Sequence, residues 1–329
     1  MNRKTLRYFV LPLMVLLLQS CRADRPRFLD THTPITVGIL DVRFKDGAEK
    51  FRDKLAKRLD LINATPDGRR LRFVIEHTPF VGGIDAAARR LVAQSPDILL
   101  AVVDDAALAL GAITKTIPIV FQSYDDPVAK GIVRSMTAPD ANLTGHSFYR
   151  RTHLKRWELL LQAAPHVRRI GVLLDANYVP VGILEDMEKA KTGLGVDILP
   201  LYLTRDEPFA GLERKLRISG VDALDLPHIG HLTMNQRKTV AEIVKLNKPA
   251  SFDGDLYCSW GGTICYARQN TPLENLAADY IKLVMRGARP SEIPVSSVSK
   301  YQLSLNITSM KRLRLQPPHA LISTARIYE

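Results

Sequence analysis

The sequence predicts an α/β protein of two doubly wound lobes, each built from a parallel sheet with helices on both faces. Short apolar segments alternate with amphipathic helical segments, and this alternation is typical of parallel sheets connected by crossover helices. The alternation runs from residue 35 to residue 121 and restarts at residue 153. A chain of 329 residues is long enough for two domains of ordinary size, each with its own core.

The first lobe is expected to begin at residue 35, after a polar, proline-containing tether over residues 21–34. Its first strand is the compact apolar run 35–40, and a polar loop separates this strand from the first helix. Further strands are expected at 71–76, 97–103 and 117–121, and helices at 48–61, 84–93 and 105–111.

The second lobe repeats this order, beginning with a helix. Helices are expected at 153–162, 181–192, 209–219 and 235–246, and strands at 169–174, 197–202, 223–226 and 249–252. A helix at 272–286, a strand at 298–306 and a last helix at 308–314 remain once each lobe has its sheet. A chain that returns to both lobes in this way is expected to join them by several hinge strands.

The first 20 residues have the pattern of a secretory signal. Arg3, Lys4 and Arg7 precede an apolar run over 8–18, which is too short to span a bilayer with ease. The run ends in Leu-Gln-Ser-Cys21, which resembles a bacterial lipobox, so Cys21 is the expected lipidation site and mature N-terminus. An ordinary exported protein and a membrane-spanning anchor are the alternatives. In each case the body is expected to work outside the cytoplasm, held at a bacterial membrane if Cys21 is lipidated.

The chain is basic, but its charge does not predict a nucleic-acid partner. The formal charge is +12, and removing the three basic residues of the signal leaves +9. The basic residues are scattered over predicted helices, as at 54–58 and 311–314, without interleaved aromatic residues. We interpret them as solvated helix faces, with attraction to anionic lipid headgroups as the alternative.

Two cysteines remain after Cys21 is assigned to lipidation. In an oxidising compartment Cys258 and Cys265 either pair across the turn 259–262 or stay as buried free thiols. The eight histidines are dispersed, and no histidine and cysteine cluster has the spacing of metal ligands. We therefore expect neither a metal nor a cofactor.

Candidate ligand-binding residues lie where predicted strands end, because ligands of open α/β sheets bind outside the carboxyl ends of the strands. Several have plainer interpretations: Asp105 as a helix N-cap, Tyr149 and Tyr178 as amphipathic residues at a lobe edge. The candidates are Asp41, Phe44, Asp104, Asp105, Ser123, Tyr124 and Asp125 in the first lobe, and Tyr149, Asn177, Tyr178, Asp253 and Tyr257 beyond it.

Short motifs in a fixed order resemble those of the ABC-transporter substrate-binding proteins, the family that includes tryptophan- and tyrosine-type binding lipoproteins. Each motif alone is weak, because it consists mostly of turn and core residues, but together they extend over residues 35–329. The motifs are Asp126-Pro-Val with Gly131-Ile-Val and Asn142-Leu-Thr-Gly, then Lys155-Arg-Trp-Glu-Leu-Leu, Pro165 and Arg169-Ile-Gly-Val-Leu, and finally Gly261-Gly, Ala277-Ala, Gly287-Ala-Arg-Pro, Ile293-Pro-Val and Lys300-Tyr-Gln-Leu-Ser-Leu-Asn.

The resemblance implies a type I periplasmic-binding-protein fold, with two lobes, three crossover strands and a ligand in the cleft between the lobes. It places the crossovers near 145–148, 262–266 and 294–301. The N-terminal lobe then comprises 35–145 and about 267–295, and the C-terminal lobe 146–266 and about 296–329. Such a protein closes about its hinge on a small molecule and delivers it to an ABC permease in the inner membrane, without covalent chemistry.

One departure from the family pattern bears on the ligand. Where relatives carry a small hydroxyl residue followed by Pro and Ala, this chain has Asp104-Asp105-Ala-Ala. Carboxylates there repel an anionic ligand and, with Asp41, Asp125 and Asp253, predict an acidic cleft. We therefore expect a cationic or zwitterionic ligand, amine-bearing or resembling an aromatic amino acid.

Three other classes of protein are alternatives to this function. A ligand sensor that docks on a membrane receptor or kinase has the same fold and the same closure, so it remains the alternative function. An enzyme using Asp125 and Asp253 as a carboxylate pair is disfavoured, because the sequence has no nucleophile elbow, P-loop or metal motif. A DNA-binding regulator needs an N-terminal helix-turn-helix, and the signal occupies that place.

Overall fold

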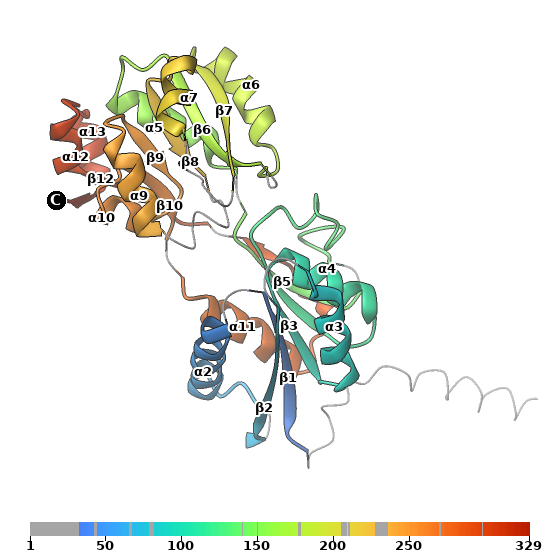
Figure 1. Cartoon of the computed structure of the whole chain (residues 1–329). Coiled ribbons are helices and arrows are strands. Elements are labelled where there is room, and N and C mark those ends of the chain that lie inside the picture. The colour runs from blue at the N-terminus through green and yellow to red at the C-terminus, as the bar shows by residue number, and fades with distance from the viewer. Residues whose placement is uncertain are drawn as a thin grey trace, which may run out of the picture. The chain divides into compact units, whose positions relative to one another are not determined.

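The computed structural model describes residues 33–42, 45–65, 68–78, 82–139, 141–149, 151–176, 179–204, 209, 211–227, 236–269, 271–297 and 299–329, although not the side chains of residues 45 and 46. The chain forms two compact units (Figure 1). Unit 1 comprises Met1–Gln122, Val133–Gly145 and Leu273–Pro294, and unit 2 comprises Ser123–Ile132, His146–Pro272 and Val295–Glu329.

The sheet associated with unit 1 has the strand order β11-β5-β4-β3-β1-β2. Its inner strands are fully buried runs of aliphatic residues, as expected for a parallel sheet covered on both faces. The strands are β1 (Ile35–Asp41), β2 (Leu71–His77), β3 (Ile98–Val102), β4 (Ile119–Ser123), β5 (Leu143–Ser147) and β11 (Ser296–Ser297), and the β1–β2, β1–β3, β3–β4 and β5–β11 pairs are parallel.

Helices cover both faces of this sheet. Helices α2 (Lys45–Leu61) and α11 (Leu273–Met285) lie against one face, and α3 (Ile84–Ala93) and α4 (Asp104–Ile113) against the other (Figure 1). The short 3₁₀ helix η4 (Pro290–Glu292) follows α11. Gly145 is required where β5 approaches β4, because a Cβ atom there would lie 2.0 Å from the Phe121 carbonyl oxygen.

The sheet of unit 2 has the strand order β13-β12-β10-β9-β8-β6-β7. All its pairs are parallel except β10 with β12, which is antiparallel. The strands are β6 (Arg169–Asp175), β7 (Asp197–Leu203), β8 (Ala223–Leu226), β9 (Ala250–Phe252), β10 (Ile264–Arg268), β12 (Tyr301–Asn306) and β13 (Arg326–Tyr328).

Two apolar clusters pack against this sheet. Trp157 and Leu160 belong to one cluster together with strand and helix residues such as Val172 and Met310, and Leu216 and Phe252 belong to the other. The helices are α5 (His153–Ala163), α6 (Ile183–Gly193), α7 (Leu212–Ser219), α9 (Gln236–Lys245), α10 (Asp255–Ser259), α12 (Ile307–Arg312) and α13 (His319–Thr324).

The predicted fold class is confirmed: the protein is α/β, with two sheets dominated by parallel strands. The unit boundaries after Gly145 and Pro294 coincide with two of the expected crossovers. The region 262–266, where a third crossover was expected, instead begins β10 inside the sheet of unit 2, and the chain enters unit 1 at Leu273. Residues 123–132 also belong to unit 2.

The sequence left the pairing of two cysteines open, and the structure joins them. Cys258 in α10 and Cys265 in β10 form a disulfide, with their Cα atoms 5.9 Å apart. The disulfide is buried in the second apolar cluster and attaches the short helix α10 to the sheet.

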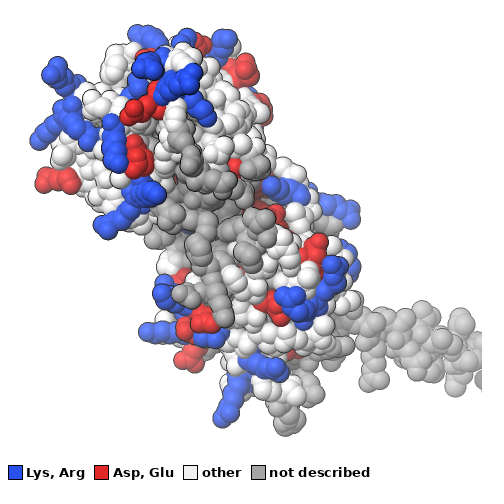
Figure 2. Space-filling view, viewed as in Figure 1, with Lys and Arg blue, Asp and Glu red and all other residues white. Residues whose placement is uncertain are grey.

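The surface charge matches the scattered pattern of the sequence. On the face shown in Figure 2, lysine and arginine side chains are spread over both units and interleaved with acidic ones. Among the described helices, none combines the length and apolar character needed to cross a membrane. Cys21 and the rest of the signal lie outside the described residues.

Candidate ligand-binding site

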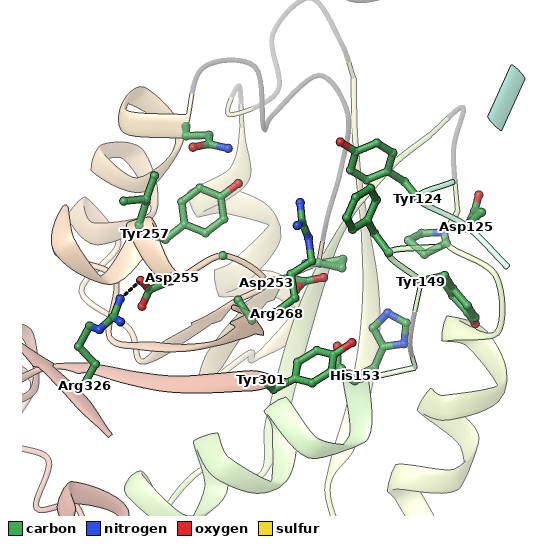
Figure 3. A pocket seen from close by; sticks show the side chains of 18 of the residues that line it. Tyr124, Asp125, Tyr149, His153, Asp253, Asp255, Tyr257, Arg268, Tyr301 and Arg326 are labelled. Carbon is green, nitrogen blue, oxygen red and sulfur yellow. Dashed lines mark hydrogen bonds and ion pairs between the residues drawn. The ribbon is translucent and has the colours of Figure 1, made fainter. Parts of the chain in front are cut away.

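Unit 2 contains a cavity of about 430 Å³, a size within the usual range for small-molecule sites. Every residue that lines it belongs to unit 2. Figure 3 shows Tyr257 on one side of the cavity and Tyr124 with Tyr149 on the other, with Arg268 between them. The lining residues are Tyr124, Asp125, Phe148, Tyr149, Thr152, His153, Pro180, Pro227, Gln236, Asp253, Gly254, Asp255, Leu256, Tyr257, Ala267, Arg268, Tyr301, Arg326 and Tyr328.

A buried ion pair lies next to Asp253, one of the residues that line the cavity. Nε and Nη2 of Arg156 donate to the two carboxylate oxygens of Asp225 at 2.9 and 2.8 Å, and both side chains are fully buried. Ser251 donates to Asp225 at 2.6 Å, and Thr152 accepts from Arg156 at 3.0 Å. Burial opposes ionisation of Asp225, but Arg156 and Ser251 outweigh it and keep the carboxyl pKa below its usual value.

Asp253 lies near this ion pair and also lines the cavity. It follows β9, and its backbone N–H donates to the Leu226 carbonyl at 3.0 Å, which fixes the strand end. One carboxylate oxygen lies 3.6 Å from Nη1 of Arg156, and the side chain is 29% exposed. Asp253 is therefore held in place by Arg156 and its backbone hydrogen bond while it keeps access to the cavity.

The other two carboxylates of the cavity already have cationic partners. Asp255 accepts from Arg326 at 2.7 Å and from the Tyr328 hydroxyl at 3.0 Å, and Figure 3 shows the ion pair with Arg326. Asp125 is buried and lies 3.1 Å from Nζ of Lys130. These contacts neutralise both residues locally.

Arg268 supplies a positive charge to the same cavity. It ends β10, and the carbon of its guanidinium lies 4.2 Å from the centre of the Phe148 ring, a cation–π contact. Among the described residues, no carboxylate forms an ion pair with it. Burial, and secondarily Arg268, lower the pKa of His146 to about 4, so that imidazole is neutral at pH 7 and adds no charge.

Aromatic rings supply the apolar part of the walls. Tyr124 packs against Phe148 with ring centres 5.1 Å apart, and Tyr257 packs against Phe252 at 5.4 Å. Burial raises the pKa of Tyr149 to about 12, and the Tyr149 hydroxyl donates to the Val181 carbonyl at 2.9 Å. Burial, and secondarily Asp253, also raise the pKa of Tyr257, so both phenols are protonated at neutral pH.

The structure brings five of the twelve predicted ligand residues together, namely Tyr124, Asp125, Tyr149, Asp253 and Tyr257. Ser123 is buried beside them, and its hydroxyl donates to the Asp125 carbonyl at 2.7 Å. The other predicted residues are not part of this cavity: Asp41, Asp104 and Asp105 lie in unit 1, and Phe44, Asn177 and Tyr178 lie outside the described residues.

The acidic character expected for the site does not describe the cavity of unit 2. Asp253 and Asp255 face Arg268 and Arg326 there, and Lys130 neutralises Asp125. Sequence reasoning missed Arg268 because the segment that became β10 was interpreted as a crossover. The apolar run 264–267 directly before Arg268 could have identified it, because the same pattern identified Asp253 after β9.

An α/β fold with a ligand-sized cavity at strand ends is typical of proteins that bind small molecules. Residues 82–327 match the family model for the ABC transporter substrate binding protein, and the chain belongs to that family. The resemblance read from the sequence motifs is thereby confirmed. Among the described residues, no cluster of histidine, cysteine and carboxylate side chains is arranged to hold a metal ion.

Individual relatives are more distant. The chain is 25% identical over 236 residues to a tyrosine-binding protein from Clostridioides difficile (strain R20291), and the aligned region covers 70% of this chain and 66% of that protein. It thus spans just under two thirds of the length of this relative.

Solved structures share the fold at lower identity. A conserved domain protein from Vibrio cholerae has a TM-score of 0.76 and 20% identity, covering 90% of this chain and 100% of that one. An ABC domain from Streptococcus pneumonia in complex with L-Trp has a TM-score of 0.74 and 19% identity, with the same coverage.

Proposed function

We propose that the protein is the extracytoplasmic solute-binding component of an ABC import system, and that the cavity of unit 2 holds an amino-acid-like ligand with an aromatic part. The observation that carries the proposal is the combination of Asp253, which is held yet accessible, with tyrosine rings on the facing walls. The tyrosine-binding relative and the structural neighbour with L-Trp support the ligand class.

The chemistry of the cavity suits an amine attached to an aromatic group. A primary ammonium donates charge-assisted hydrogen bonds to a carboxylate such as Asp253. Aromatic ligand rings gain from contact with protonated tyrosines, which present a large apolar face and a polar edge. No described residue in the cavity needs to react for this purpose, so the proposal is binding without covalent chemistry.

Further parts of the proposal rest on the sequence. Lipidation at Cys21 holds the protein at the membrane, and an ABC permease receives the ligand. We also propose that closure about the hinge segments adds the residues that the sequence predicts for the first lobe, Asp41, Phe44, Asp104 and Asp105, together with Ser123, to the ligand contacts. Asn177 and Tyr178 complete the proposed set.

Calorimetric titration of the purified protein against the twenty amino acids, tyramine and tryptamine tests this function. We expect binding of an aromatic amino acid, and we expect Asp253→Asn to weaken it by about 10- to 100-fold, because an amide does not offset the charge of the ammonium group. Asp197→Asn, at the opposite end of a strand in the same unit, is the matched control and leaves the affinity unchanged. Absence of binding to every compound contradicts the proposal.

A further inference from the structure

Arg268 is the charged residue of the cavity for which the described residues provide no ion-pair partner. Two of the carboxylates that line it have a cation of their own, since Asp125 has Lys130 and Asp255 has Arg326, whereas Asp253 shares Arg156 with Asp225. Arg268 has an aromatic ring beneath it and, within the described part of the chain, no carboxylate in ion-pair contact. The cavity therefore presents a guanidinium whose charge no described residue neutralises through an ion pair.

The backbone holds Arg268 in a defined position. It is paired with Tyr301 across the antiparallel β10–β12 ladder, and the next residue, Gln269, donates its N–H to the Lys300 carbonyl at 3.0 Å. Both Arg268 and Tyr301 line the cavity. A side chain on a paired strand loses less freedom on binding than one on a loop, so the guanidinium is prepared for a ligand.

The surroundings of the guanidinium favour an anion. Arg268 is half-buried and lies against the Phe148 face, and partial removal from water strengthens its attraction for negative charge. The planar fork of a guanidinium matches the two oxygens of a carboxylate. Asp253, across the same cavity, provides the complementary site for a cation (Figure 3).

We propose that Arg268 binds the carboxylate of the ligand while Asp253 binds its ammonium group, so that the cavity selects zwitterionic α-amino acids over the corresponding amines and deaminated acids. This inference rests on the proposed function and specifies the substrate class of the same site. Of the cationic and zwitterionic ligands that the acidic strand ends suggested, it selects the zwitterionic one.

Arg268→Gln tests the assignment, with L-tyrosine, tyramine and 3-(4-hydroxyphenyl)propionate as probes, and with the tryptophan series if the protein prefers indole. The wild-type protein is expected to bind the amino acid about 100-fold more tightly than the amine. In Arg268→Gln this ratio falls to about 3-fold or less, while amine affinity stays constant or rises because a like charge has been removed. A general disturbance of the fold would weaken both probes together.

Two further variants serve as a partial rescue and as a control. Arg268→Lys retains the charge without the fork and is expected to recover part of the ratio. Arg237→Gln removes another arginine that stacks on an aromatic ring, Trp260 at 5.6 Å, but lies outside the cavity lining, so the ratio stays at the wild-type value.

The outcomes distinguish this inference from the proposed function. If the wild-type protein binds an aromatic amino acid and both Arg268 variants keep its preference over the amine, the Arg268 assignment is overturned and the proposed function stands. If Arg268→Gln does not bind any probe, the result for Arg268→Lys is decisive. If the lysine variant recovers no preference for the amino acid over the amine, the assignment is also overturned. If no amino acid binds the wild-type protein, both proposals fall.

Discussion

Arg156 and Arg268 serve the same cavity in opposite ways. Arg156 is fully buried, donates twice to Asp225 and lies near Asp253, so its charge is neutralised within the protein. Arg268 is half-buried over Phe148 without a carboxylate partner among the described residues. The difference teaches that a buried charge with several partners fixes the geometry of a site, whereas a held but unneutralised charge is available to a ligand.

The largest effect is expected from breaking the buried pair. Asp225→Asn leaves Arg156 buried with only the more distant Asp253, and we expect a loss of about 3 kcal/mol in the free energy of unfolding. Denaturant unfolding at pH 7 measures it. Glu158→Gln is the control, because Glu158 and its partner Lys155 are 41% and 46% exposed and such a pair contributes about 1 kcal/mol or less.

The same pair predicts a pH dependence. The pKa of Asp225 is lower in the folded protein than in the unfolded chain, so its contribution is fully present above the unfolded pKa of about 3.9 and is lost as the pH falls through the lower folded pKa. The difference in unfolding free energy between the wild type and Asp225→Asn should therefore shrink below about pH 4. A difference that stays constant down to pH 2 would show that the ion pair is not its source.

A smaller effect is expected on the pKa of His146. This pKa reports the charge of Arg268 in the absence of a ligand. Burial is the larger cause of the lowered pKa of His146 and Arg268 the second. Arg268→Gln should therefore raise this pKa from about 4 but leave it below 6.5. An NMR titration of the imidazole measures the shift, and an unchanged pKa would mean that the charge of Arg268 is screened from His146.

The sequence predicted most of the elements that are built from apolar runs or from amphipathic helical segments. Apolar runs predicted as strands at 97–103 and 117–121 became the buried central strands β3 and β4, and Asp253, a polar residue just after another such run, lines the cavity. Some elements were missed: β10 was interpreted as a crossover, and β13 and α13 have too few residues to show a period.

The charge balance of the site could not be predicted, because it depends on contacts between distant segments. Asp225 meets Arg156 from 69 positions away, and Asp255 meets Arg326 from 71. The negative charge of such carboxylates is offset in the folded protein by arginines that are distant in the sequence. Arg268 is the reverse case, since nothing in its neighbourhood in the sequence indicates that it faces an aromatic ring rather than a carboxylate.

The central claim is that this cavity recognises both charged groups of an aromatic amino acid, and a crystal structure with the bound ligand tests it most directly. We predict the ammonium group within about 3.2 Å of the Asp253 carboxylate and the carboxylate group within about 3.2 Å of the Arg268 guanidinium, with the ring against the tyrosines. A ligand that occupies the cavity with its carboxylate turned away from Arg268, or one that lies outside the cavity, would contradict the account.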